Sequence, residues 1–101
     1  MEKIKFIYAD LQKTGDKENS ILLTTIGTKK DLEKHEVKFE EGETYWFWRD
    51  NEIDNPLVFP AKVRFNKDLN AWIADYDPNS IKEFLDSEFA NQYSPKDIEN
   101  G

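Results

Sequence analysis

The chain has 101 residues, of which 38% are hydrophobic and 14% aromatic, and its formal net charge is −7. This length fits one domain, the aromatic share argues against disorder, and the negative charge disfavours binding to nucleic-acid phosphate or to an anionic membrane. The lack of cysteine excludes disulfides, thiol nucleophiles and zinc–thiolate sites. With no apolar run approaching ~20 residues and no signal-peptide pattern, we expect a cytoplasmic protein.

The first part of the chain is predicted to form two strands joined as a hairpin. Residues 3–8 alternate in hydrophobicity, a period of two that is typical of a half-buried strand. Residues 14–20 are turn formers and charged residues, which predict an exposed loop. Residues 21–26 are rich in β-branched side chains and predict a more deeply buried second strand.

A short helix is expected after these strands. Thr28, followed three residues later by Asp31, is a variant of the capping box that often begins a helix. Residues 29–35 can then form two helical turns. Leu32 is the only apolar residue among them, so this helix is predicted to lie on the surface.

Three further strands follow in the middle of the chain. Residues 44–49 form the densest apolar run, residues 57–65 alternate cleanly, and residues 71–76 alternate again after a polar turn. Pro60 cannot donate a backbone hydrogen bond to a neighbouring strand. The strand 57–65 is therefore expected to be an edge strand, or to be bulged at Pro60.

The C-terminal part is predicted to be a helix followed by a loose tail. Ser80 and Glu83 satisfy the S-x-x-E capping box. Four apolar residues then recur at helical spacing and would form one stripe: Ile81, Phe84, Leu85 and Phe89. We predict one compact domain over residues 1–93, with residues 94–101 as a frayed tail.

These elements predict a mainly β fold of the α+β class. We expect a small antiparallel sheet of five or six strands, arranged as an SH3-like barrel or a meander, with a short internal helix and a C-terminal helix. An OB-like barrel is less favoured, because its helix normally lies between the third and fourth strands, whereas here the internal helix follows the second.

The aromatic run from residue 45 to residue 48 is the most informative candidate for function. Strand alternation places Tyr45 and Phe47 on one face, and Trp46 and Trp48 on the other. One interpretation is that both faces are buried, the second under the C-terminal helix. The alternative leaves one pair exposed as a groove for a peptide or a partner surface.

The loop after this run supplies acidic residues but no convincing metal site. Asp50, Glu52 and Asp54 stand at alternate positions, a spacing that calcium loops also use. The sixth position lacks glycine, Pro56 follows directly, and no flanking pair of helices is expected, so we predict a solvated loop and no metal or cofactor. The predicted binding surface consists of Tyr45, Trp46, Trp48, Asp50, Glu52, Asp54 and Trp72.

No catalytic apparatus is recognisable in the sequence. His35 is the only histidine, and it has no evident nucleophile or orienting partner. The four glycines are isolated and form no phosphate-binding loop. Carboxylate pairs arise by chance in a chain with 21 acidic residues. We therefore predict a protein that is not an enzyme.

The sequence is best explained as a small protein-interaction module that binds through an aromatic and acidic surface. The aromatic rings would bury apolar area, and the acids would steer a basic protein partner. One alternative is an inhibitor or immunity-like protein that blocks a basic site on its partner. Another is a barrel that binds a small ligand, although barrels of this size are usually filled by their own side chains. No oligomeric state is predicted.

Overall fold

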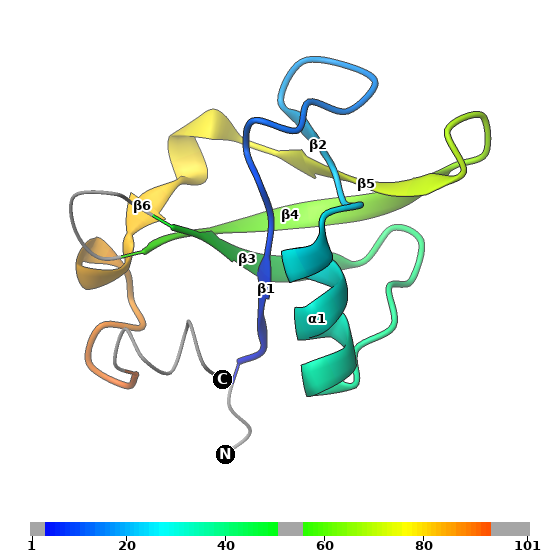
Figure 1. The fold of residues 1–101 in the computed structure, drawn as a ribbon. Helices are drawn as coiled ribbons and strands as arrows, with labels where there is room; N and C mark the ends of the chain where they lie inside the picture. The colour runs from blue at the N-terminus through cyan, green and yellow to red at the C-terminus, as the bar shows by residue number, and fades with distance from the viewer. Residues whose placement is uncertain (1–3, 51–55, 94–101) are drawn as a thin grey trace.

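The computed structural model describes residues 4–50 and 56–93, and it contains one six-stranded sheet with the order β1-β3-β4-β5-β2, in which β6 pairs with β4 (Figure 1). The elements are β1 (Phe6–Tyr8), β2 (Ser20–Leu22), α1 (Ile26–His35), β3 (Thr44–Arg49), β4 (Leu57–Asn66), β5 (Ala71–Tyr76), the 3₁₀ turn η1 (Pro78–Ser80), β6 (Lys82–Glu83) and the 3₁₀ turn η2 (Phe84–Asp86). The predicted α+β class is confirmed. The sheet is not closed into a barrel, so the SH3-like arrangement is not confirmed.

The three predicted central strands are confirmed as β3, β4 and β5. They form an antiparallel meander in which Phe47 pairs with Phe59 and Val63 pairs with Ala74. β4 is the central strand, contrary to the edge position that Pro60 suggested. On one side of β4, however, β5 pairs only as far as Ala61 and β6 pairs only with the first two residues of the strand, so Pro60 lies in the gap between them.

The predicted hairpin between the first two strands is wrong. β1 pairs in parallel with β3 through Phe6 and Trp46, whereas β2 pairs with β5 at the other edge of the sheet. A smaller hairpin forms instead, with a bridge from Thr14 to Ile21. The alternation identified extended segments correctly, but pairing partners are decided by packing between distant residues.

The internal helix α1 is confirmed, but it begins at Ile26, three residues before the predicted start. Thr25 is the N-cap, because its side chain accepts a hydrogen bond from the Thr28 N–H at 3.3 Å. The helix ends at His35, and Glu36 is its C-cap, with a φ of 56° in the left-handed region. Thr28 is fully buried and faces β1 rather than capping the helix.

The predicted C-terminal α-helix is wrong over the residues that the structure describes. Residues 78–93 form η1, β6, η2 and turns, and Phe84 donates its N–H to the Pro56 carbonyl at 2.8 Å. Pairing with β4 replaces the helical hydrogen bonds of this segment, and Leu85 of the expected stripe is 57% exposed. The predicted frayed tail, residues 94–101, lies outside the described residues.

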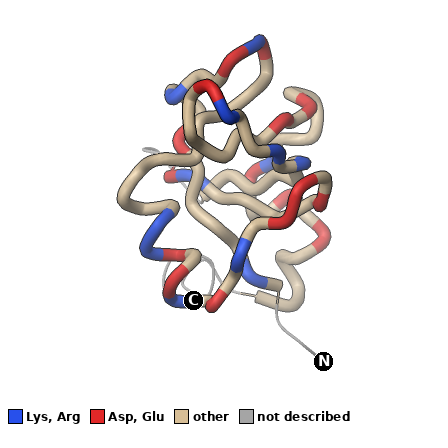
Figure 2. The backbone as a smooth tube through the Cα atoms, turned by 90° about the vertical axis from the view of Figure 1, so that its right-hand side faces the viewer, with Lys and Arg blue, Asp and Glu red and all other residues tan. Residues whose placement is uncertain are grey.

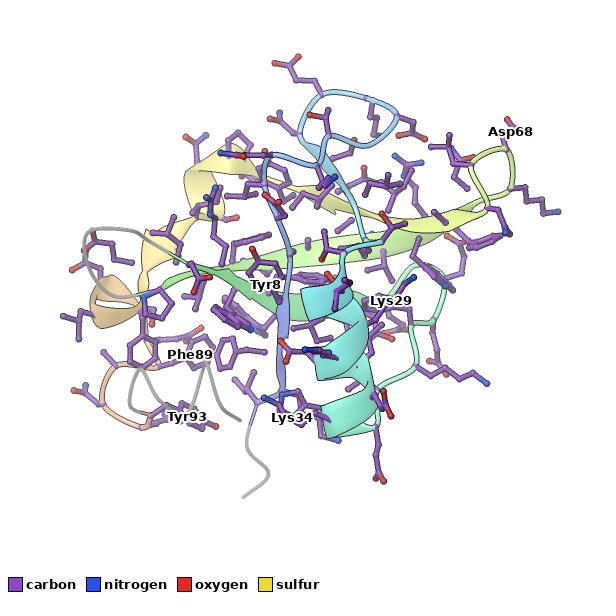
Figure 3. The ribbon with its side chains drawn as sticks, in the orientation of Figure 1. Tyr8, Lys29, Lys34, Asp68, Phe89 and Tyr93 are labelled. Atoms are coloured by element: carbon purple, nitrogen blue, oxygen red, sulfur yellow. The ribbon has the colours of Figure 1, made fainter. Side chains whose placement is uncertain are left out.

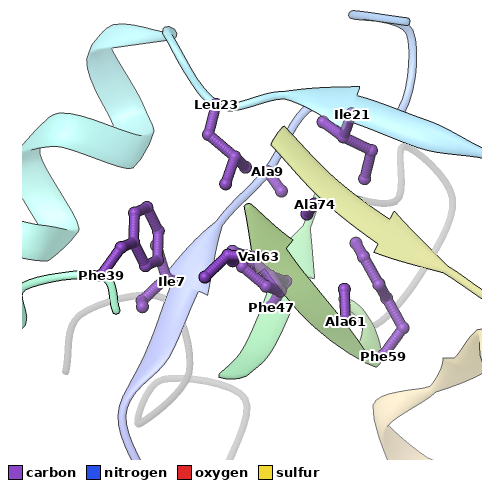
Figure 4. Packing of buried hydrophobic residues seen from close by; sticks show 10 residues of the cluster. All are labelled: Ile7, Ala9, Ile21, Leu23, Phe39, Phe47, Phe59, Ala61, Val63 and Ala74. Atoms are coloured by element: carbon purple, nitrogen blue, oxygen red, sulfur yellow. The ribbon is translucent and has the colours of Figure 1, made fainter. Parts of the chain in front are cut away.

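Two apolar clusters lie on opposite faces of the sheet. The first, whose packing Figure 4 shows, contains Ile7, Ala9, Ile21, Leu23, Phe39, Phe47, Phe59, Ala61, Val63 and Ala74. The second contains Phe6, Trp48, Val58, Phe84 and Phe89, so the C-terminal segment covers the outer face of β3 and β4. Within the described part of the chain, no helix is long and apolar enough to cross a membrane.

Candidate functional site

The structure does not bring the predicted binding residues together in one surface. Tyr45 and Trp72 are half-buried and pack beside Phe39 against the first cluster. Trp46 and Trp48 lie on the opposite face of β3, with Trp48 only 8% exposed and Trp46 half-buried. For Trp48 the core interpretation of the aromatic run applies, whereas Trp46 remains accessible.

The acidic part of the predicted surface is only partly described. Asp50 is exposed at the end of β3. Glu52 and Asp54 lie outside the described residues, so their place relative to the tryptophans stays a prediction.

A groove of about 410 Å³ opens beside Trp46, and we call it the Trp46 groove. It is lined by four residues of the sheet, by the connection between β5 and β6, and by the turn after η2; these are Trp46, Val58, Pro60, Lys82, Asn79, Ser80, Ser87, Glu88 and Phe89. A volume of this size is in the range of small-molecule and side-chain binding sites, roughly 300–1,000 Å³.

The Trp46 groove exists because the sheet is interrupted beside Pro60. After β5 ends at Tyr76, the chain leaves the sheet through η1 and returns only at Lys82, which pairs with Val58. Asp77 holds this detour, since its carboxylate accepts the Asn79 N–H at 2.9 Å and its carbonyl accepts the Ser80 hydroxyl at 2.6 Å. Proline has no N–H, so the gap leaves no backbone donor unpaired at this position.

The aromatic side of the groove is held in place by contacts that do not need a ligand. Trp46 and Phe89 meet edge to face at a centroid distance of 4.7 Å and an angle of 86°. Phe89 also contacts Phe6 at 5.4 Å and is itself buried. The Ser87 hydroxyl donates to the Phe84 carbonyl at 2.7 Å and accepts the Phe89 N–H at 3.2 Å. The rings are therefore preorganised.

Two opposite charges line the groove. Lys82 and Glu88 are exposed, and neither forms an ion pair with any other described residue. The groove thus combines an aromatic wall with one cation and one anion that are free to interact with a bound group. Sequence reasoning selected Trp46 but missed Phe89, which it assigned to a helix, and Pro60 was the local signal of the gap.

A smaller hollow of about 280 Å³ lies near Trp48 and is lined by Tyr8, Gly27, Lys30, Asp31, Trp48 and Asp50. Here the buried Asp31 carboxylate accepts two hydrogen bonds at 2.9 Å, from the Trp48 indole N–H and from the Tyr8 backbone N–H. The Thr28 hydroxyl donates to the Tyr8 carbonyl at 2.6 Å. Helix α1 therefore covers the outward-facing backbone groups of the edge strand β1, which is a structural role.

The remaining charged contacts are structural and lie away from the Trp46 groove. Arg64 donates hydrogen bonds to Asp16 and Asp75, which ties the loop before β2 to the sheet, and it holds the pKa of the Asp16 carboxyl well below its usual range. Burial lowers the pKa of His35, and burial raises the pKa of Tyr8. Among residues 4–50 and 56–93, no group of three or more histidine, aspartate or glutamate side chains could hold a metal ion.

The chain was compared with known protein families, curated proteins and solved structures. No protein-family model matches the chain, and neither the search of curated proteins nor the search of solved structures returned a match.

Proposed function

We propose that the protein is a non-enzymatic interaction module that receives a large apolar side chain of a partner protein in the Trp46 groove. The observation that carries this proposal is the groove itself, about 410 Å³ in volume, with a preorganised aromatic wall and free charges at Lys82 and Glu88. A ring entering beside Trp46 would gain edge or face contacts beyond its buried area. The two charges would orient the flanking parts of the bound segment.

The absence of catalytic features in the groove supports a binding role. The groups with shifted pKa values, Tyr8, Asp16, His35 and Arg64, all lie outside its lining. The hydroxyls of Ser80 and Ser87 donate to carbonyls, so neither is positioned as an activated nucleophile. A small free ligand is the second candidate, because the groove volume also suits one.

The proposal is tested by panning a phage-displayed library of random 12-residue peptides against the full chain. Enriched peptides should share a large apolar residue. Their affinity should fall about 10- to 100-fold on Asn79→Trp, which fills the groove with an indole, because burial of one apolar side chain contributes about 1.5–3 kcal/mol. Asn79 is exposed, so this change leaves both apolar clusters intact.

Asn91→Trp is the matched control, since Asn91 is also exposed and does not line the groove. If every enriched peptide bound wild type and both variants equally, the groove would be refuted as a binding site. If no peptide is enriched but a library of small aromatic compounds shifts the Trp46 indole resonance, the small-ligand function replaces the peptide-binding function.

A further inference from the structure

The end of the molecule opposite the Trp46 groove carries exposed apolar side chains at the end of β4 and on the turn between β4 and β5. Figure 3 places Phe89, at the groove, and Asp68, in this turn, at opposite ends of the protein. Phe65 is 38% exposed and Leu69 is 52% exposed, although both are large and hydrophobic. Scattered exposed apolar residues are common, so this observation needs support from its surroundings.

Phe65 is the outermost member of a row of aromatic rings. Its ring meets the Trp72 ring edge to face, with 5.4 Å between the ring centroids. The centroid distance is 5.8 Å from Trp72 to Phe39, and 5.1 Å from Phe39 to Tyr45. Phe39 is buried in the first cluster, and Tyr45 and Trp72 are half-buried beside it. The exposed rings are therefore rigidly backed by the core, so burying them against a partner would cost little side-chain entropy.

An acidic loop is held along this row by hydrogen bonds that involve side chains and the backbone. The loop contains Glu40, Glu41 and Glu43, which are all exposed. Glu41 accepts the Phe65 N–H at 3.0 Å through its carboxylate, and the Tyr45 hydroxyl accepts the Glu40 N–H at 2.9 Å. The loop backbone also bonds to Val63 of β4: the Gly42 N–H donates to the Val63 carbonyl at 2.8 Å, and the Val63 N–H donates to the Glu43 carbonyl at 2.9 Å. We call this surface, Phe65, Leu69, Trp72 and the three glutamates, the aromatic–acidic end.

The charge of the aromatic–acidic end is uncompensated. Among the described residues, the three glutamates form no ion pair, whereas Asp16, Asp31 and Asp75 are paired with Arg64, Lys17 or Lys34. Within residues 38–43 and 66–69 there are four carboxylates against two lysines. Figure 2 faces this end of the molecule and shows acidic residues on its loops. A second copy with the same charge would be repelled.

We propose that the aromatic–acidic end docks a basic amphipathic protein segment, in which a lysine or arginine stands beside a large apolar side chain. The apolar side chain would cover Phe65 and Leu69, and the basic side chain would reach the glutamates. This surface is independent of the Trp46 groove, so the molecule has two binding ends. The proposal assigns the basic partner expected from the sequence to the aromatic–acidic end, which contains Trp72, rather than to the loop after Arg49.

The test uses the full chain with Asn79→Trp as the bait, so that the Trp46 groove is blocked and failure of either site can be recognised separately. A phage-displayed library of random 12-residue peptides is panned at low salt. Enriched peptides should combine lysine or arginine with a large apolar residue. Their binding should weaken about five- to tenfold on the triple change Glu40→Gln, Glu41→Gln and Glu43→Gln, and by a similar factor on Leu69→Ser.

A second triple variant separates local from overall charge. Glu18→Gln, Glu33→Gln and Glu36→Gln change the net charge by the same amount at exposed positions outside the aromatic–acidic end. Binding should change less than twofold in this variant. Equal weakening by both triple variants would overturn the proposal, and so would enriched peptides without basic residues or a failure to enrich any peptide on this bait.

Discussion

Replacement of Asp31 by alanine should destabilise the protein strongly, because one buried carboxylate joins α1, β1 and β3. The Asp31 carboxylate accepts the Trp48 indole N–H and the Tyr8 N–H, each at 2.9 Å. A buried donor left without an acceptor costs about 1–3 kcal/mol. The whole of this range applies to the indole N–H of Trp48, which is 8% exposed. Only its lower end applies to the backbone N–H of Tyr8, because Tyr8 is half-buried.

The two losses add up to about 2–4 kcal/mol, and the partly exposed Lys34 ion pair adds less than about 1 kcal/mol. The higher helix propensity of alanine stabilises the variant by about 0.5 kcal/mol and offsets a small part of this loss. We therefore expect the free energy of unfolding to fall by about 2–4 kcal/mol, a large part of the ~5–15 kcal/mol of a typical domain. The melting temperature should fall by about 10–30 °C.

Urea denaturation followed by tryptophan fluorescence and far-UV circular dichroism measures this change. Asp31→Asn keeps an acceptor oxygen for the two donors and loses only the charge, so it should cost about 1 kcal/mol. Glu33→Ala, at an exposed position on the same helix, should stay within about 0.5 kcal/mol of wild type. If Asp31→Ala is as stable as Glu33→Ala, the carboxylate does not hold α1 on the sheet edge.

Three further outcomes follow from burial and from the shifted pKa values. Phe84→Ala should lower the free energy of unfolding by about 3–5 kcal/mol, and Leu85→Ala by less than about 1 kcal/mol, because Phe84 is fully buried and Leu85 is 57% exposed; equal losses in urea denaturation would contradict the described C-terminal path. Burial lowers the His35 pKa below its ordinary 6.5, so the unfolded chain takes up this proton first as the pH falls. Stability should then drop from pH 6.5 down to the folded-state pKa, and His35→Gln should remove that part of the pH profile; an unchanged profile would refute it. Hydrogen bonds from Arg64 hold the Asp16 pKa below its ordinary 3.8, so this stabilisation is complete above pH 3.8 and is lost as the pH falls further; Asp16→Asn should make acid unfolding below pH 3.8 less steep, and the same steepness would count against the ion pair.

The elements that could be predicted are those whose signal is contained in neighbouring residues. The dense apolar run identified β3, and alternation identified β4 and β5, almost to their ends. The partners of β1 and β2 could not be predicted, because the two strands pair at opposite edges of the sheet with residues far away in the sequence. Local alternation predicts which face of the sheet a side chain lies on, but it does not predict the order of the strands.

The C-terminal segment shows why a helical pattern can mislead. Four apolar residues at helical spacing also suit a chain that turns across a sheet, with Ile81 facing the first cluster and Phe84 and Phe89 facing the second. The Ser80 hydroxyl bonds backwards to the Asp77 carbonyl instead of capping a following helix. The Trp46 groove depends on this path, so its lining could not be assembled from the sequence beyond Trp46.

The most direct test of the binding role is a chemical-shift map of the ¹⁵N-labelled full chain titrated with a peptide selected on wild type. The largest changes should occur at the Trp46 indole N–H and at the backbone N–H groups of Ser80, Lys82 and Phe89, which surround the groove. These changes should vanish in Asn79→Trp and persist in Asn91→Trp. Changes that spare these positions, or that survive the filled groove, would contradict the Trp46 groove as the binding site.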